Sequence, residues 1–345
     1  MKVKVTRPVV DALTFLLAGD EWHEGEGRER FEKICRRVDK AIAEGTCIPL
    51  FAQGTRYRKS FQVVLPSGKN ATVFLGAVQP DRQNRGVRIS LNPAKLKPGD
   101  IDFFHAVMKK LLGSLYLRQL ETPVINRIDF AVDLIGAQLD KLLFAYTNAQ
   151  KLTIFAKQLD TRSHIESIYF GSISSDYRAV VYDKKAEMLH QYISSLISQG
   201  LELENPQSNV IRKIEATKGQ PESTRIEIRG QKLRKMTPSE LCNMPNRFSR
   251  FKITDLSIEG AQLPELIEDS FLALCRQNGV KDAFEKFKTS RWSRKIHTYY
   301  RTRQASWWNP ETMWTEACEV LKQSGIFPAE AFSVSDLREE DEFLI

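Results

Sequence analysis

Apolar and polar residues alternate along three segments of the chain, residues 125–134, 178–184 and 224–230. This alternation indicates β-strands, because successive side chains of a strand point to opposite faces of its sheet. In each segment one of the two faces is rich in charged residues. The sequence therefore predicts three strands that each present a polar face.

Other segments rich in β-branched and aromatic residues predict further strands at residues 57–65, 71–78, 85–91, 165–170 and 248–258. Pro66, Ser67 and Gly68 separate the first two and predict a hairpin. Gly171 and the serines that follow it predict a tight turn between the strands at 165–170 and 178–184.

Apolar residues recur at helical spacing in a second group of segments. They predict helices at residues 8–18, 24–44, 101–117, 139–149, 185–198, 266–277, 280–287 and 311–323. The helix at 8–18 would have proline in its first turn, Asp100 would cap the helix at 101–117, and the helix at 139–149 would be a crossover connection. Residues 202–220 are polar and predict a loop.

This order of elements predicts an α+β fold, with a mixed, mainly antiparallel sheet and flanking helices. We expect an N-terminal helical segment at residues 1–50, a catalytic domain at 51–260 and a helical, basic C-terminal region at 261–345. The last ten residues hold five acids and predict a solvated tail.

The 345 residues carry a formal net charge of +8, which favours an anionic partner such as nucleic acid. The five cysteines form no CxxC pair, and no segment is apolar enough for an export signal or a membrane span. We therefore expect a reduced, cytoplasmic protein without a membrane partner. The sequence holds no GxxxxGK[ST] or GxGxxG motif, so a site for ATP or a dinucleotide has no motif support. It also holds no GxSxG motif of hydrolases and no HxH or HExxH motif of metal sites.

Carboxylates stand on two of the polar strand faces, Asp129 and Asp133 on the first and Glu227 on the third. Such a cluster could hold Mg²⁺ or Mn²⁺, which prefer oxygen ligands. Asp129 and Asp133 are four residues apart on a strand, roughly 13 Å at ~3.3 Å per residue, which is too far for both to bind one ion easily. One of them together with Glu227 is the better pair of ligands, and we favour Asp129. The alternative is a solvated sheet face on which Arg–Asp and Arg–Glu pairs are structural.

Tyr182 lies between Arg178 and Lys184 on the polar face of the middle strand. The two interpretations are a structural tyrosine with a buried ring and a functional tyrosine beside two cations.

A basic segment follows near the C-terminus, with seven lysines and arginines and no acid between residues 286 and 303. Its cations could hold phosphates, and its aromatic residues could stack on bases or pack the segment down. The alternative is a solvated basic helix face. The predicted DNA-binding residues are Lys286, Lys288, Arg291, Trp292, Arg294, Lys295, Tyr299, Arg301 and Arg303.

Three motifs occur in order: RIDFAVD at 127–133, YFGSISSDYRAVVYDKKAE at 169–187 and TRIEIRG at 224–230. Together they resemble the rolling-circle replication initiators of small plasmids, the Rep_trans family. Phage replication initiation factors and relaxases of integrative elements are similar. The resemblance covers about residues 85 to 235 and does not extend to the C-terminal region.

The resemblance implies a metal-dependent endonuclease with a non-canonical HUH-like core, in which carboxylates replace the histidines. It implies that a tyrosine cleaves one DNA strand, stays joined to the 5′ phosphate and later rejoins the strand. The matching position is Tyr182, with Tyr177 and Tyr169 as alternatives, and Arg178 and Lys184 beside it could bind the phosphate.

The resemblance also implies origin DNA as the partner, as a hairpin or a single-stranded nick site. It allows a host helicase, a polymerase and a second copy of the chain as further partners. A relaxase with the same chemistry, and a DNA-binding protein without catalysis, are the alternative functions.

Overall fold

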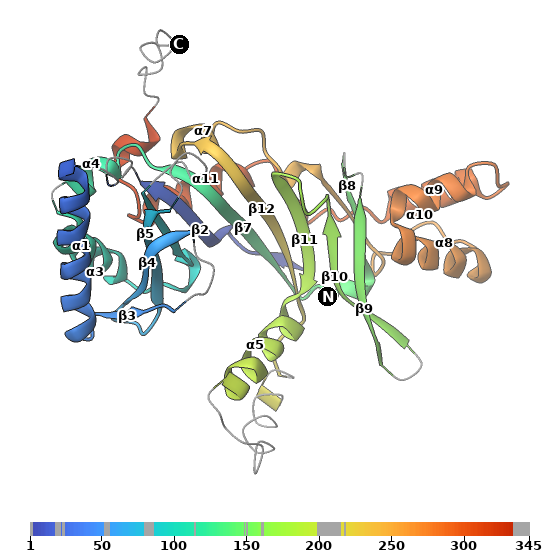
Figure 1. Ribbon diagram of the computed structural model, residues 1–345. Helices are drawn as coiled ribbons and strands as arrows, with labels where there is room; N and C mark the ends of the chain where they lie inside the picture. Colours follow the sequence, from blue (N-terminus) through green and yellow to red (C-terminus); the bar gives the residue numbers. More distant parts are fainter. Residues whose placement is uncertain are drawn as a thin grey trace, which may run out of the picture. The chain divides into compact units, whose positions relative to one another are not determined.

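The structure is a computed structural model. It describes residues 3–17, 22, 25–51, 56–78, 86–113, 115–147, 149, 151–159, 162–198, 215–216 and 219–333. Most of the predicted loop at 202–220 and the predicted acidic tail lie outside these residues. The fold is α+β with a large antiparallel sheet, as predicted (Figure 1).

The chain divides into two compact units. Unit 1 holds Met1–Pro8, Ala131–Arg229 and Asn246–Trp314, and unit 2 holds Val9–Phe130, Gly230–Pro245 and Thr315–Ile345. The division passes through two long strands, β7 (Val124–Ile135) and β12 (Ser223–Met236). The functional domains at 1–50, 51–260 and 261–345 remain a prediction.

Unit 2 contains an antiparallel run of strands in the order β3-β4-β5-β6-β2. The strands are β2 (Val9–Leu17), β3 (Cys47–Pro49), β4 (Tyr57–Val64), β5 (Asn70–Ala77) and β6 (Val87–Leu91). The helices are α1 (Gly25–Ala43), α3 (Asp100–Leu112), α4 (Leu115–Gln119) and α7 (Pro238–Cys242), with most of α11 (Met313–Gln323). The predicted hairpin is confirmed as β4–β5, and Gly68 in its turn has the positive φ of 76° that glycine adopts without strain.

The helix predicted at residues 8–18 is wrong, because this segment is strand β2. Its residues pair with β6, from Leu13 opposite Leu91 to Leu17 opposite Val87. The side chains from Leu13 to Leu17 are all buried, so both faces of this half of the strand are covered. A strand buried on both faces shows no alternation, which is why its apolar run resembled a helix.

Unit 1 contains strands in the order β7-β12-β11-β10-β9, with β1 (Lys4–Val5) paired to β7. The remaining strands are β9 (Leu152–Leu159), β10 (Arg162–Phe170) and β11 (Tyr177–Asp183). A separate two-stranded sheet pairs β8 (Leu142–Tyr146) with β13 (Phe251–Asp255). The helices are α5 (Lys184–Ser198), α8 (Glu265–Asn278), α9 (Val280–Phe287) and α10 (Ser293–Thr302).

The crossover helix predicted at 139–149 is also wrong. Leu139–Lys141 form one short 3₁₀ turn, and β8 follows because each of its residues pairs with a residue of β13. This pairing joins segments more than 100 residues apart, so no local pattern announces it. Strand β9 and helix α10 were not among the predicted elements.

One face of strands β10 and β11 is apolar and lies against the small sheet. Phe170 of β10 contacts Phe251 of β13, with ring centres 5.7 Å apart, and Tyr146 of β8, at 5.8 Å. Ala179 and Val181 of β11 are fully buried. The opposite face of the same strands is therefore the one that carries the polar residues.

Candidate functional site

Residues from the polar faces of the three predicted strands meet in unit 1, which holds the Asp133 end of the first strand. Arg225 of β12 binds Asp133 of β7, and Arg229 of β12 lies 6.0 Å from the centre of the Tyr169 ring on β10. Arg178 of β11 lies 5.0 Å from the same ring. Side chains in contact across neighbouring strands project to one side, so these residues share one face of the sheet.

Tyr182 stands on this face at the end of β11. Tyr182 lies opposite Ser167 on β10, and Val180, two residues earlier on β11, lies opposite Tyr169. Side chains two residues apart on a strand point to the same face, so Tyr182 shares a face with Tyr169 and Arg178. The residue is 9% exposed. A largely buried ring agrees with the structural interpretation, and the role of Tyr182 as nucleophile remains a prediction.

Lys184 was predicted to lie in the strand, on the same face as Arg178 and Tyr182. In the structure β11 ends at Asp183, so Lys184 is outside the strand. It is the first residue of α5, and Asp183 accepts hydrogen bonds from the backbone N–H groups of Lys185 and Ala186 at 2.9 and 3.0 Å. This carboxylate caps the first turn and starts the helix there. Lys184 nevertheless stays close to the site, since its Nζ lies 5.9 Å from the Tyr182 ring centre and 2.7 Å from Glu187 Oε2.

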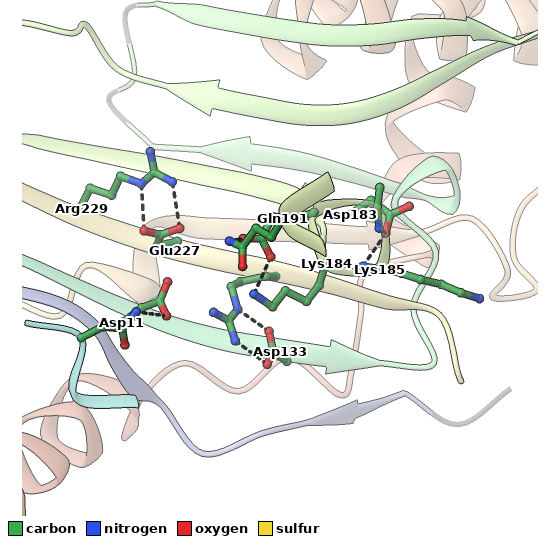
Figure 2. Close-up of polar contacts among 12 residues, drawn as sticks. Asp11, Asp133, Asp183, Lys184, Lys185, Gln191, Glu227 and Arg229 are labelled. Atoms are coloured by element: carbon green, nitrogen blue, oxygen red, sulfur yellow. Dashed lines mark hydrogen bonds and ion pairs between the residues drawn. The ribbon is translucent and has the colours of Figure 1, made fainter. Parts of the chain in front are cut away.

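Each of the two predicted metal ligands that lie in unit 1, Asp133 and Glu227, is held by an arginine (Figure 2). Arg229 donates to both oxygens of Glu227 at 2.9 and 3.0 Å, and the Glu227 side chain is 3% exposed. Arg225 donates to both oxygens of Asp133 at 2.6 and 2.8 Å. These are the bidentate pairs that the structural interpretation anticipates.

Asp129 belongs to unit 2 and is also buried, at 1% exposure. Arg127, two residues before it on the same strand, donates to both of its oxygens. Because Asp129 and Glu227 lie in different units, their predicted pairing at one metal ion remains a prediction.

The described residues contain no group of three or more histidines, cysteines or carboxylates that could hold a metal ion. Mg²⁺ usually keeps several waters and takes one or two carboxylates together with substrate phosphate. Glu227 with one aspartate fits that minimum set, although each carboxylate would have to share its oxygens with an arginine. The cofactor therefore remains a prediction.

Tyr177, one alternative nucleophile, has an unfavourable environment. Burial raises the pKa of Tyr177 to about 12, although the guanidinium of Arg247 lies 4.3 Å from its ring centre and opposes this shift. A phenol with a higher pKa is harder to ionise at neutral pH, so Tyr177 is a poorer candidate than its position in the motif suggests.

The basic C-terminal segment separates into exposed cations and packed residues. Six of the predicted DNA-binding residues are exposed and basic: Lys286, Lys288, Arg291, Arg294, Lys295 and Arg301. Arg294 and Arg301 are seven residues apart on α10, which places both on one face of the helix. A face of this kind can bind phosphates.

The aromatic residues of the segment hold the helices together instead. Tyr299 is 1% exposed and donates a hydrogen bond to Glu268 on α8 at 2.8 Å. Arg303 is buried, lies 3.9 Å from the Tyr299 ring centre and donates to the Ala261 carbonyl. Trp292 is half-buried against the same core. Tyr299 and Arg303 are thus structural residues, which corrects their assignment as DNA contacts.

One cavity of about 310 Å³ lies beside the start of α5 in unit 1, and sequence reasoning did not anticipate it. Asp140, Asp183 and Glu222 are among its lining residues. Each of these carboxylates already binds a group of the chain: the backbone N–H of Ile165, the cap of α5 and Lys185 Nζ, respectively. The cavity holds none of the predicted site residues.

No protein-family model and no curated protein matches the chain. One solved structure with a similarity to it is that of a rolling circle replication initiator protein from Geobacillus stearothermophilus. The sequence identity is 12%, the TM-score is 0.34, and the match covers 80% of this chain and 98% of that chain. A likeness of this size supports no inference about activity. Among the described residues, no helix has the length and apolar character needed to cross a membrane.

Proposed function

We propose that the chain is a replication initiator that nicks and rejoins one strand of origin DNA, with Tyr182 as the nucleophile. The observation that supports this proposal most is the gathering of Tyr182, Arg178 and two arginine-bound carboxylates on one sheet face of one compact unit. Charged and phenolic groups on a shared face could surround a phosphodiester.

In the proposed reaction the Tyr182 oxygen attacks the phosphorus of one phosphodiester. A bond forms between this oxygen and phosphorus, the bond from phosphorus to the 3′ oxygen breaks, and the phenolic proton leaves. The departing 3′ oxygen takes up a proton and becomes a free 3′-OH, from which a host polymerase could extend. Rejoining is the reverse reaction and needs no nucleotide cofactor, because the phosphotyrosine bond keeps the energy of the broken bond.

Cations and carboxylates would have separate tasks. Arg178 and Lys184 would bind the phosphate, and Lys184 would favour the phenolate because its ammonium lies 5.9 Å from the Tyr182 ring centre. Glu227, with Asp129 or Asp133, would hold Mg²⁺ or Mn²⁺, which would orient the scissile phosphate and offset its developing charge.

The exposed cations of α9, α10 and the segment between them would bind the duplex part of the origin, such as a hairpin. This assignment rests on the six exposed lysines and arginines and on the net charge of the chain. A host helicase, and a second copy of the chain in a homodimer, belong to the same proposal as further partners in the cytoplasm.

The test uses a random pool of single-stranded oligonucleotides labelled at the 3′ end, with Mn²⁺. We expect a labelled covalent protein–DNA band, because the 3′ fragment carries the 5′ phosphate that Tyr182 retains. Tyr182→Phe should give none, and Tyr177→Phe is the matched control that should keep the band. A normal band from Tyr182→Phe would overturn the assignment, and a band seen only with 5′-labelled DNA would reverse the proposed polarity.

The arginine pairing of every predicted metal ligand favours a second candidate, a DNA-binding protein without catalysis. That protein would bind duplex DNA through α10 and form no covalent band under any condition. A relaxase of an integrative element would give the same band as an initiator. Cleavage beside a transfer origin, rather than a replication origin, would identify it.

A further inference from the structure

An exposed aromatic residue stands in the same row of the sheet as Tyr182. Phe155 of β9 is the Cα partner of Ser167 on β10, and Ser167 is the partner of Tyr182 on β11. Residues directly opposite each other point to the same face, so Phe155 and Tyr182 flank the small Ser167 on the polar face. Two strand spacings of ~4.8 Å put their backbones roughly 10 Å apart.

Phe155 is unusual in its exposure. It is 53% exposed in the middle of a strand, whereas the other exposed large apolar residues described in unit 1 are the aliphatic Ile173, Met188 and Leu266. Its ring meets the ring of Tyr169 edge to face, with centres 5.4 Å apart and planes at 80°. The contact orients Phe155 while half of its surface stays open to a ligand.

Two arginines lie beside one ring of this pair, that of Tyr169. The guanidinium groups of Arg178 and Arg229 lie 5.0 and 6.0 Å from the Tyr169 ring centre. Arg229 is engaged with Glu227, whereas Nε of Arg178 is a buried donor with no hydrogen-bond acceptor among the residues that the structure describes. Arg178 as a residue is only half-buried, so its guanidinium could donate to a phosphate oxygen.

We propose that Phe155, Tyr169 and Arg178 form a stacking platform for single-stranded nucleic acid, with a base against Phe155 and a phosphate on Arg178. The proposal deepens the proposed function, on which it rests, because it assigns the residues that hold the strand beside Tyr182. Alternating rings and cations are the usual means of binding a single strand without regard to sequence. A duplex would hide its base faces from Phe155.

The test measures binding without cleavage. Tyr182→Phe protein without divalent metal is titrated against a fluorescein-labelled oligothymidylate of about 12 nucleotides, within the usual site sizes of single-strand binding folds. Phe155→Ala in this background should weaken binding by about 5- to 150-fold, the range for loss of one stacked base. Phe155→Trp should keep the affinity, and DNA should quench its added fluorescence. The matched control is Ile173→Ala, which removes an exposed apolar side chain of the same unit and should change nothing.

A second comparison separates stacking from charge and from apolar area. An abasic oligomer of the same length keeps the phosphates and lacks the bases, so the parent protein should bind it more weakly than oligothymidylate. Phe155→Ala should lose this preference, and so should Phe155→Leu, which keeps apolar area but has no π-face. An unchanged preference in both variants would overturn the platform.

The outcome is independent of the nicking reaction. If the wild type forms no covalent band but Phe155→Ala still loses single-strand affinity, the platform stands and the nuclease assignment fails. If the band forms and Phe155→Ala binds oligothymidylate like its parent, the nuclease assignment stands and the platform fails. Arg178→Gln should weaken binding of both the abasic and the base-bearing oligomer, since it would remove a phosphate contact.

Discussion

At the scale of single residues, the central finding is that the predicted metal ligands are arginine partners. Glu227 and Asp129 are both buried, and a buried carboxylate is costly unless it is paired. The sequence shows arginines two residues from both, at Arg127 and Arg229. The sequence predicted such pairs as the structural alternative, but period-two spacing on a strand cannot decide between a structural pair and a metal site.

Replacing both members of one pair distinguishes these roles. Glu227→Gln and Arg229→Gln should each lower the free energy of unfolding, measured in urea, by roughly 1–3 kcal/mol, because each leaves a partner unpaired, and Arg229 is partly exposed. The double variant should recover part of this loss. If Glu227 also binds metal, Mn²⁺ affinity measured by calorimetry should fall in Glu227→Gln and in the double variant but not in Arg229→Gln. Equal Mn²⁺ binding by all of these proteins would contradict a metal role for Glu227.

At the scale of elements, sequence patterns predicted best where the structure is local. The hairpin β4–β5, helix α1 and the turn at Gly171 follow from turn residues and helical periodicity, and Gly171 has a φ of 98°. The two errors, at 8–18 and 139–149, are segments whose strands pair with distant partners. Strand β9, which carries Phe155, was not predicted. The sequence analysis therefore could not place Phe155 across the sheet from Tyr182.

The start of α5 fixes the place of Lys184, and Asp183 defines that start. Asp183→Ala should lose the cap of α5 and about 1 kcal/mol of stability. For a chain of this size, differential scanning calorimetry should show a melting temperature lower by about 1–2 °C. Asp183→Asn is the matched control, because asparagine caps helices equally well. A large loss in Asp183→Asn would mean that the charge, and not the cap, is what matters.

Helix α10 should account for part of the electrostatic binding to duplex DNA. Arg294→Gln and Arg301→Gln should each reduce the slope of log affinity against log salt by about 0.9, for one lost phosphate contact. Arg30→Gln, an exposed change on α1 of unit 2, is the control and should leave the slope unchanged. Arg303→Gln should instead lower thermal stability, because Arg303 is buried against Tyr299. Unchanged slopes for both α10 variants would remove this helix from the DNA-binding surface.

At the scale of the whole molecule, the chain consists of two units whose division runs between Asp129 and Asp133 on one strand. Tyr182, Asp133, Glu227, Arg178 and Lys184 all fall in unit 1, and α8 to α10 fall there too. The order of the motifs predicted this gathering only through a resemblance, because strand order in a sheet depends on pairings between distant segments. The net charge of +8 predicted the kind of partner but not its position.

The role of Tyr182 as nucleophile is tested by identifying the residue that becomes joined to DNA. The covalent complex formed with Mn²⁺ would be digested with nuclease and protease, and its peptides mapped by mass spectrometry. We predict a nucleotide attached through its 5′ phosphate to Tyr182, in the peptide of β11. Attachment to Tyr169 or Tyr177, or the absence of any nucleotide-bearing peptide, would contradict the account.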